Sequence, residues 1–199
     1  MSVTCSVLVL FYSRHGSTLQ LAQHIARGVN SIEGCEAKLR TVAEIEQSDH
    51  APNAPIVSLD DLEQCDGLAM GSPVWFGNMA APLKHLWDKT TTQWIKGSLI
   101  DKPACVFTSS SSLHGGQESN LHSMMLPLLH HGMWIVGIPY SQPKLHTTQT
   151  GGTPYGASAV TEHSSRLSND EISLAQSLGR RLGRIALNNK HCCFDDDNV

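Results

Sequence analysis

Several features that would place this chain in a familiar class are missing from its sequence. It has no N-terminal stretch that joins basic and apolar residues like a signal peptide, and no apolar run near the ~18 residues of a membrane span. The 14 Lys and Arg are outnumbered by 18 Asp and Glu, for a formal net charge of −4, so no basic face for nucleic acid is expected. These absences predict a cytoplasmic protein without a nucleic-acid or integral membrane partner.

Motifs with defined chemistry are also missing. Neither G-x-G-x-x-G nor G-x-x-x-x-G-K-[ST] occurs, so neither a dinucleotide pyrophosphate nor a nucleoside triphosphate is the first expectation for a phosphate ligand. Without G-x-S-x-G, a serine hydrolase is poorly supported. The 11 histidines have no metal-ligand spacing and the cysteines form no C-x-x-C pair, so we expect no metal site and reduced thiols at Cys5, Cys35, Cys65, Cys105, Cys192 and Cys193.

Strand-like and helix-like segments alternate along most of the chain. Apolar runs predict buried strands, and one segment of alternating polarity predicts an edge strand, in the order 7–11, 37–42 (the edge), 67–72, 102–108 and 133–136. Helical spacing predicts helices over 18–31, 59–64, 120–131 and 168–185, and the segment 168–171 fits a capping box at the start of the last one. Asn78 is the expected cap of one more helix, with Pro82 in its first turn. This alternation predicts a parallel sheet with helices on both faces.

Two segments lack a clear period. Residues 43–66 are rich in Pro, Asp, Glu and Gln and are expected to form a surface excursion. Residues 138–167 are rich in Gly, Pro, Ser and Thr, which is typical of a functional loop, a disordered segment or an interface. We expect one domain over residues 1–187, followed by an acidic tail over 188–199 that is expected to be disordered.

The first predicted strand runs into a loop suited to an anion. In the segment 13–18, Ser13, Ser17 and Thr18 offer hydroxyls, Gly16 permits a close turn, and the unpaired N–H groups of a helix start point at the same place. A terminal monophosphate fits this pattern, and flavin mononucleotide (FMN) is the common cofactor that presents one. Ordinary helix capping after a strand is the alternative interpretation of the same residues.

Two later loops share the composition and the position of the first. The segment 72–78 follows the strand 67–72, the segment 109–117 follows the strand 102–108, and both contain Gly, Ser or aromatic residues. The carboxyl ends of parallel strands lie at one edge of a sheet, where open α/β sheets bind ligands. The three loops together therefore favour a flavin-like cofactor site.

The chain resembles the flavodoxin-like family and, more closely, the WrbA-type NAD(P)H:quinone oxidoreductases. The resemblance covers about residues 5–187 and rests on the segments LVLFYSRHGST at 8–18, GSPVWFGNMAAPLK at 71–84, GGQE at 115–118, HHGM at 130–133 and GGTPYGA at 151–157. It implies a doubly wound five-stranded parallel sheet of order 2-1-3-4-5 and bound FMN. It also implies two-electron reduction of quinones by NADH or NADPH in a ping-pong reaction.

The same resemblance implies roles for individual residues. The segment 13–18 would hold the phosphate, Val74 to Phe76 would border the isoalloxazine, and the segment 109–116 would wrap the ribityl chain and the pyrimidine edge. His131 would approach the flavin from a neighbouring subunit of a homotetramer, a dimer of dimers. No protein residue is expected to be catalytic, and the expected cofactor-binding residues are Ser13, Arg14, His15, Gly16, Ser17, Thr18, Pro73, Val74, Trp75, Phe76, Gly77, Ser109, Ser110, Ser111, Ser112, Leu113, His114, Gly115, Gly116 and His131.

Substrate contacts and departures from the family complete the expectation. His15 and Trp94 are the expected substrate-binding residues, although Trp94 also suits a core position. Relatives commonly carry Thr-Arg where Val74 and Trp75 stand, and often a tyrosine where His15 stands. Trp75 is therefore expected to stack near the flavin or to shape the acceptor pocket, and the alternative is that it packs in the core. The 110–114 run replaces a glycine-threonine-glycine run and is one residue longer.

Three functions remain open at this stage. The leading one is the quinone reductase, and the others are a flavodoxin-like electron carrier or regulatory FMN-binding protein, and an NADPH-dependent FMN or azo-compound reductase. No fingerprint in the sequence separates NADH from NADPH.

Overall fold

The computed structural model describes residues 5–46, 52–161 and 166–196, with side chains described up to residue 190. Its centre is a parallel sheet of β1 (Cys5–Phe11), β2 (Cys35–Thr41), β3 (Gly67–Pro73), β4 (Pro103–Ser110), β5 (Trp134–Ile135) and β6 (Ala157–Val160). The hydrogen-bonded path is β2-β1-β3-β4-β5, which confirms the predicted order.

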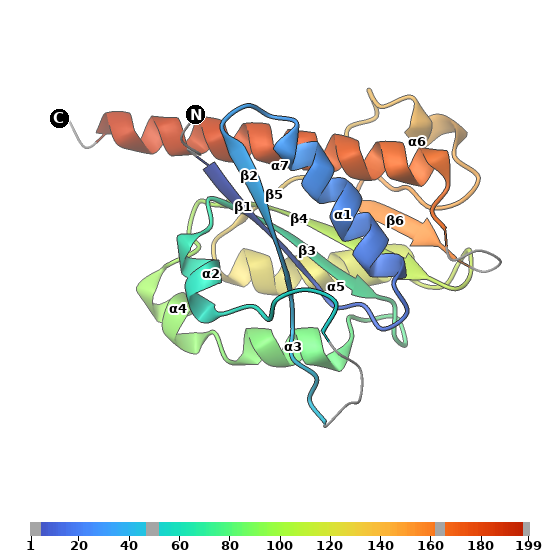
Figure 1. Ribbon diagram of the computed structural model, residues 1–199, viewed down its shortest axis with the longest axis horizontal. Coiled ribbons are helices and arrows are strands. Elements are labelled where there is room, and N and C mark those ends of the chain that lie inside the picture. The colour runs from blue at the N-terminus through green and yellow to red at the C-terminus, as the bar shows by residue number, and fades with distance from the viewer. Residues whose placement is uncertain (1–4, 47–51, 162–165, 197–199) are drawn as a thin grey trace.

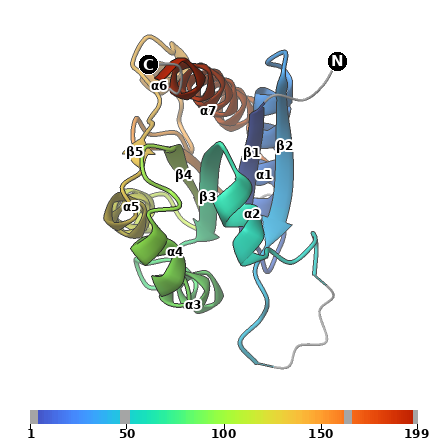
Figure 2. The same ribbon diagram turned by 90° about the vertical axis from the view of Figure 1, so that its left-hand side faces the viewer.

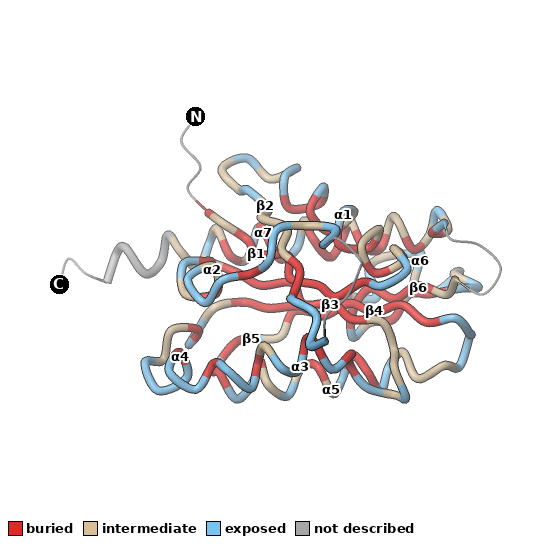
Figure 3. The backbone as a smooth tube through the Cα atoms, turned by 60° about the horizontal axis from the view of Figure 1, so that its bottom comes forward, coloured by how far each residue is buried: buried red, intermediate tan, exposed pale blue. Residues whose placement is uncertain are grey.

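Helices cover both faces of the sheet (Figure 1 and Figure 2). Helices α1 (Ser17–Asn30) and α7 (Asn169–Asp196) bury apolar side chains with one set of alternate strand residues. Helices α2 (Leu59–Gln64), α3 (Ala81–Asp88) and α5 (Gln117–His130) contribute to the core on the other face. Two short helices, α4 (Thr91–Lys96) and α6 (Lys144–Thr147), complete the described elements. The central strands β1, β3 and β4 are buried along almost their whole length, as Figure 3 shows.

The sheet has a sixth strand, β6, beside β4, which the sequence did not predict. Short β5 pairs with the start of β4, and β6 pairs with its end over Phe107 to Ser110. Strand β6 lies in the segment 138–167, which we expected to have little regular structure. This strand is only four residues long, so it is too short to show an alternating hydrophobic pattern, and it is recognised as a strand only by its pairing with β4.

Helix α7 runs beyond the predicted domain end, along the whole sheet (Figure 1). The expectation of a disordered tail over 188–199 was therefore wrong up to Asp196, and residues 197–199 lie outside the described part. Two contacts hold the extension on the body: Asn189 Nδ2 donates to Asp101 O at 3.0 Å, and Lys190 Nζ lies 2.9 Å from Asp66 Oδ2. No glycine or proline interrupts the helix there, so the tail continues it.

Glycines set the close packing of α1 on α7. A Cβ added at Gly179 would lie 2.1 Å from Ile25 O, and one at Gly28 would lie 2.2 Å from Gln176 O. Because neither backbone oxygen can move without moving its helix, only glycine allows these helices to approach so closely.

The N-terminal caps were predicted with mixed success. The capping box at the start of α7 is confirmed, because Ser168 N donates to Glu171 Oε2 at 2.7 Å and Glu171 N donates to Ser168 Oγ at 3.2 Å. The predicted cap of α3 was wrong. Ala80 is the N-cap there, and Asn78 Oδ1 instead accepts from Met79 N at 2.8 Å, inside the preceding turn. Pro82 falls in the first turn of α3, as predicted.

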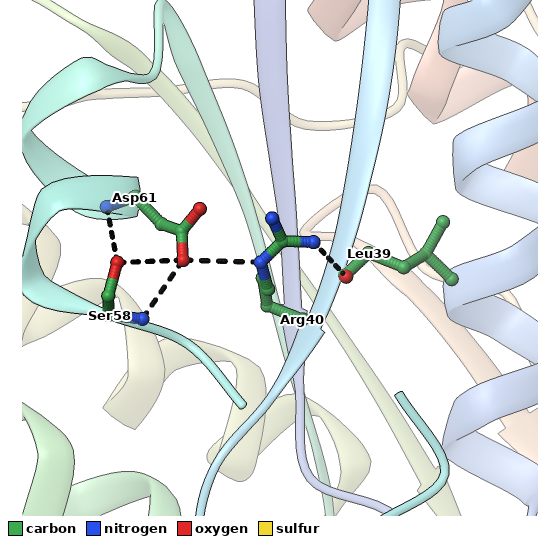
Figure 4. Close-up of polar contacts among 4 residues, drawn as sticks. All are labelled: Leu39, Arg40, Ser58 and Asp61. Atoms are coloured by element: carbon green, nitrogen blue, oxygen red, sulfur yellow. Dashed lines mark hydrogen bonds and ion pairs between the residues drawn. The ribbon is translucent and has the colours of Figure 1, made fainter. Parts of the chain in front are cut away.

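The excursion 43–66 is tied to the edge strand by one polar cluster (Figure 4). Ser58 caps α2 through Asp61 N, and Asp61 Oδ2 accepts from Ser58 N and from Arg40 Nε on β2 at 3.2 Å. Burial of Asp61 opposes its charge, but these hydrogen bonds outweigh burial and hold the pKa of its carboxyl below the ordinary value. The predicted helix 59–64 is confirmed.

None of the described helices combines the length and the apolar composition needed to cross a bilayer.

Candidate cofactor and substrate site

The loop after β1 forms a cradle of hydroxyls and backbone N–H groups. Ser13 Oγ accepts from Gly16 N and from Leu19 N, both at 3.2 Å, which curls the loop over the start of α1. Gly16 is the N-cap at φ +92°, a left-handed conformation that disfavours other residues, and no side chain caps the helix. The first-turn N–H groups therefore face the carboxyl edge of the sheet, as an anion site requires.

A second helix begins at the same edge in the same way. Gly116 is the N-cap of α5 at φ +94°, again without a side-chain cap. The serine-rich loop before it is braced by Gln117, whose Nε2 donates to Ser110 Oγ and Ser112 O, both at 2.6 Å. The N-termini of α1 and α5, which carry partial positive charge, thus lie at this edge of the sheet, and no lysine is needed there.

The loops after β1, β3 and β4 enclose one cavity of about 240 Å³, which we call the flavin-phosphate cavity. Eleven of the twenty predicted cofactor residues line it together with Thr161: Ser13, Arg14, His15, Ser17, Thr18, Pro73, Val74, Trp75, Ser109, Ser110 and Ser111. Its hydroxyls are linked, since Thr18 Oγ1 lies 2.8 Å from Ser109 Oγ and Ser17 Oγ lies 3.4 Å from Thr161 Oγ1.

Thr161 is the lining residue that the sequence did not reveal. It follows β6 directly, and its N donates to Ser110 O at 2.9 Å. No local motif marks it, because the pairing of β6 with β4 alone brings it to the cavity. An alternation Ala-Ser-Ala-Val before it was the only available signal.

The loop after β3 ends in a tight turn that exposes an aromatic ring. Trp75 and Asn78 exchange backbone hydrogen bonds of 2.9 and 3.1 Å around Phe76 and Gly77. Both central residues have positive φ, +52° and +78°, as in a type I′ turn. Phe76 is strained in this region and fully exposed. Neither Phe76 nor Gly77 lines the flavin-phosphate cavity.

Trp75 borders the flavin-phosphate cavity and also packs against the core. It lines the flavin-phosphate cavity, and its ring meets Tyr12 edge-on at 5.5 Å between centroids while packing against the core. Tyr12 is buried and donates its hydroxyl to Glu44 at 3.0 Å. Burial, followed by the contact with Glu44, raises the pKa of Tyr12 to about 12.

The remaining predicted residues lie elsewhere. Leu113, His114 and Gly116 line a cavity of about 360 Å³ next to the 150–160 segment. Gly16 lies within the phosphate loop, while Ser112 and Gly115 form the turn that Gln117 braces.

His131 and Trp94 share a third cavity of about 310 Å³, which we call the His131 cavity. It lies at the end of α5 remote from Gln117, and a 14-residue helix spans about 20 Å. Trp94 Nε1 donates to His130 O at 2.8 Å, so Trp94 is fixed although its side chain is half exposed. Within one chain, these two residues therefore do not join the three loops.

Thr90 decides which nitrogen of His131 carries the proton. Thr90 Oγ1 donates to Trp87 O at 2.7 Å, so toward His131 Nε2, 2.9 Å away, it accepts. The neutral ring thus has its proton on Nε2, and Nδ1 is a buried acceptor without a partner among the described residues. Burial, followed by His130, lowers the pKa of His131. In this arrangement His131 has no free N–H to offer to a ligand.

The donor set fits FMN. Hydroxyls and helix-start N–H groups surround the flavin-phosphate cavity, and charge-assisted hydrogen bonds of about 1.5–3 kcal/mol each suit a phosphate without any lysine. A Cβ built on Gly16 would meet nothing within 4 Å, so the backbone presents an open approach. Ser13, Ser17 and Thr18 would hold the phosphate, and Val74 and Trp75 would border the ring.

The chain is similar in sequence to several known proteins. The family model described as NADPH-dependent FMN reductase matches residues 6–143. Two relatives named NAD(P)H dehydrogenase (quinone), from Chromohalobacter salexigens and Syntrophobacter fumaroxidans, are 39% and 40% identical, and each alignment covers 90% of this chain and 96% of the relative.

Solved structures share the fold. The flavodoxin, WrbA-like protein from Agrobacterium tumefaciens superposes with a TM-score of 0.70 at 22% identity, covering 93% of this chain and 99% of that one. A flavodoxin from the domain Archaea gives 0.63 at 15% identity, with 91% and 98% covered. The flavodoxin-like fold agrees with the sequence comparisons, and the match over residues 6–143 and relatives near 40% identity establish that this chain belongs to the NADPH-dependent FMN reductase family.

Proposed function

We propose that this chain is an FMN-dependent oxidoreductase that passes a hydride from NADH or NADPH to a quinone in a two-electron, ping-pong reaction. The observation that carries the proposal is the convergence of three loops and the glycine-capped start of α1 on one cavity at the carboxyl edge of the sheet. The quinone activity in the names of relatives near 40% identity supports the choice of reaction.

FMN, when bound, supplies the reversible uptake of a hydride, so the protein needs no nucleophile. Ser13, Ser17 and Thr18 anchor the phosphate, and the Thr18–Ser109 contact keeps the first and third loops together. Trp75, held by Tyr12, limits water beside the ring. N–H groups of the 110–116 loop stabilise negative charge that reduction brings to the pyrimidine edge.

The reaction is tested by anaerobic mixing of FMN-loaded protein with each nucleotide. The proposal expects complete bleaching of flavin absorbance, followed by stoichiometric reoxidation on addition of a benzoquinone. Flavin that stays oxidised with both nucleotides would instead indicate an electron carrier or regulatory FMN-binding protein. Turnover with free FMN or an azo compound but not with quinones would indicate the related reductase.

We also propose a homotetramer in which His131 and Trp94 face the flavin of a neighbouring subunit. The position of the His131 cavity, about 20 Å along α5 from the three loops, supports a role for a second subunit. Light scattering should give four chains of 21.6 kDa. Mixing subunits that carry Ser17→Ala and Thr18→Ala with subunits that carry Trp94→Ala should restore activity in hybrids, and no restoration would contradict shared sites.

We also propose that the protein is cytoplasmic.

A further inference from the structure

A second cavity adjoins the flavin-phosphate cavity on the side of β2. Its volume is about 470 Å³, larger than that of the flavin-phosphate cavity, and it shares Ser13 and Arg14 with it. We call it the Arg14 cavity. Its lining includes Tyr12, Arg14, Val42, Glu44, Asn53 and Ile56.

The walls of the Arg14 cavity are held in place by hydrogen bonds. Asn53 Nδ2 donates to Ser13 O at 2.9 Å, which ties the excursion to the phosphate loop. Thr41 N donates to Pro55 O at 3.0 Å and Val57 N donates to Thr41 O at 2.8 Å, so Ile56 is clamped beside the end of β2. A ligand would therefore meet a formed surface.

The chemistry of this surface suits a nucleoside with a phosphate. Ile56 is exposed and offers apolar area of the kind on which a planar base packs, whereas the lining residues Tyr12 and Val42 are buried and add little area. Glu44 is occupied by the Tyr12 hydroxyl, and its carboxylate can accept from sugar hydroxyls. Arg14 is exposed, makes no hydrogen bond or ion pair with the described residues, and is the one Lys or Arg among the lining of either cavity.

The charge of Arg14 acts on the Arg14 cavity. It opposes the rise in the pKa of Tyr12, whose side chain lines the Arg14 cavity and not the flavin-phosphate cavity. The phosphate cradle in turn is built from hydroxyls and backbone N–H groups. Arg14 is therefore available for a phosphate other than that of FMN.

We propose that the Arg14 cavity takes the adenosine end of the nicotinamide nucleotide, with Arg14 binding one of its phosphates. The inference rests on the proposed function. A nicotinamide dinucleotide whose nicotinamide reaches the flavin extends beyond the flavin-phosphate cavity, and the Arg14 cavity would receive its adenosine end. Two phosphate sources share this chemistry, namely the diphosphate common to NADH and NADPH and the 2′-phosphate of NADPH.

The test measures binding without any redox reaction. FMN-loaded protein is titrated calorimetrically with adenosine 5′-diphosphate and with adenosine 2′,5′-bisphosphate, neither of which carries nicotinamide. Arg14→Gln should raise the Kd of one probe or both by about tenfold, since a charged hydrogen bond at an exposed site is lost. An effect confined to the bisphosphate assigns the 2′-phosphate, and an effect on the diphosphate assigns the shared one.

Matched variants separate this site from general charge effects. Arg27→Gln removes an exposed arginine of α1 outside both cavities and should change neither Kd. Glu44→Gln keeps an acceptor for Tyr12 but weakens the acceptor for the sugar hydroxyls, so it should raise the Kd of the probes. The proposal is overturned if wild-type protein binds neither probe, if Arg14→Gln changes both by less than twofold, or if it weakens only FMN. Failure of NADH and NADPH to reduce the flavin would count against the proposed function. It would not affect the binding measurements, because the two probes carry no nicotinamide.

Discussion

Thr90 Oγ1 lies 2.9 Å from His131 Nε2, and because this hydroxyl already donates to Trp87 O, it accepts the ring proton. Thr90→Val should leave that N–H buried without an acceptor and lower the free energy of unfolding by about 1–3 kcal/mol. Thr90→Ser keeps the oxygen and should cost less. Urea unfolding measures both variants, and equal values for Val and Ser would mean that the hydroxyl contributes nothing.

Stability should fall below neutral pH because His131 is held neutral. Burial, then His130, lowers its pKa in the folded chain, whereas the unfolded value is about 6.5. Between those two pKa values the unfolded chain binds a proton that the folded chain does not, so stability drops as the pH falls through this window. His24, whose pKa burial also lowers, adds to the same trend.

The contribution of His131 to this trend is separable. Its replacement His131→Gln keeps an amide N–H for Thr90 and cannot be protonated in this range. The difference in urea midpoint between pH 8 and pH 5 should therefore shrink in the variant. A difference as large as that of the wild type would assign the trend to other groups.

Loss of the phosphate hydroxyls should weaken FMN binding. The double change Ser17→Ala and Thr18→Ala removes two donors from the flavin-phosphate cavity, and the Kd for FMN should rise by roughly 10- to 100-fold. Ser31→Ala, at the other end of α1, is the matched control and should leave the Kd unchanged. Flavin fluorescence titration reports both, and an unchanged Kd in the double variant would refute the phosphate assignment.

Two glycines of α7 should respond oppositely to the same substitution. Gly179→Ala places its Cβ 2.1 Å from Ile25 O and should cost about 2–3 kcal/mol through forced separation of α1 and α7. At Gly183 the nearest atom would be 3.5 Å away, so alanine fits and should stabilise the helix by about 0.5–1 kcal/mol. Similar thermal shifts for the two variants would show that the close approach has no energetic weight.

The sequence by itself determined the alternation of strands and helices and the family, and the family resemblance implied the strand order. Apolar runs separated by helical periods allow few topologies, and Gly16 and Gly116 stand where a strand gives way to a helix, a position visible in the chain. The capping box before α7 was equally local, since both partners lie within four residues.

Only the tertiary structure decided which distant residues meet. Thr161 joins the flavin-phosphate cavity because four-residue β6 pairs with β4, and no local pattern encodes that pairing. Asn53 reaches Ser13 across 40 residues to shape the Arg14 cavity. The same holds for His131, whose proton position depends on Thr90 of another element. Local periodicity specifies elements, whereas a cavity depends on contacts between residues far apart in the chain.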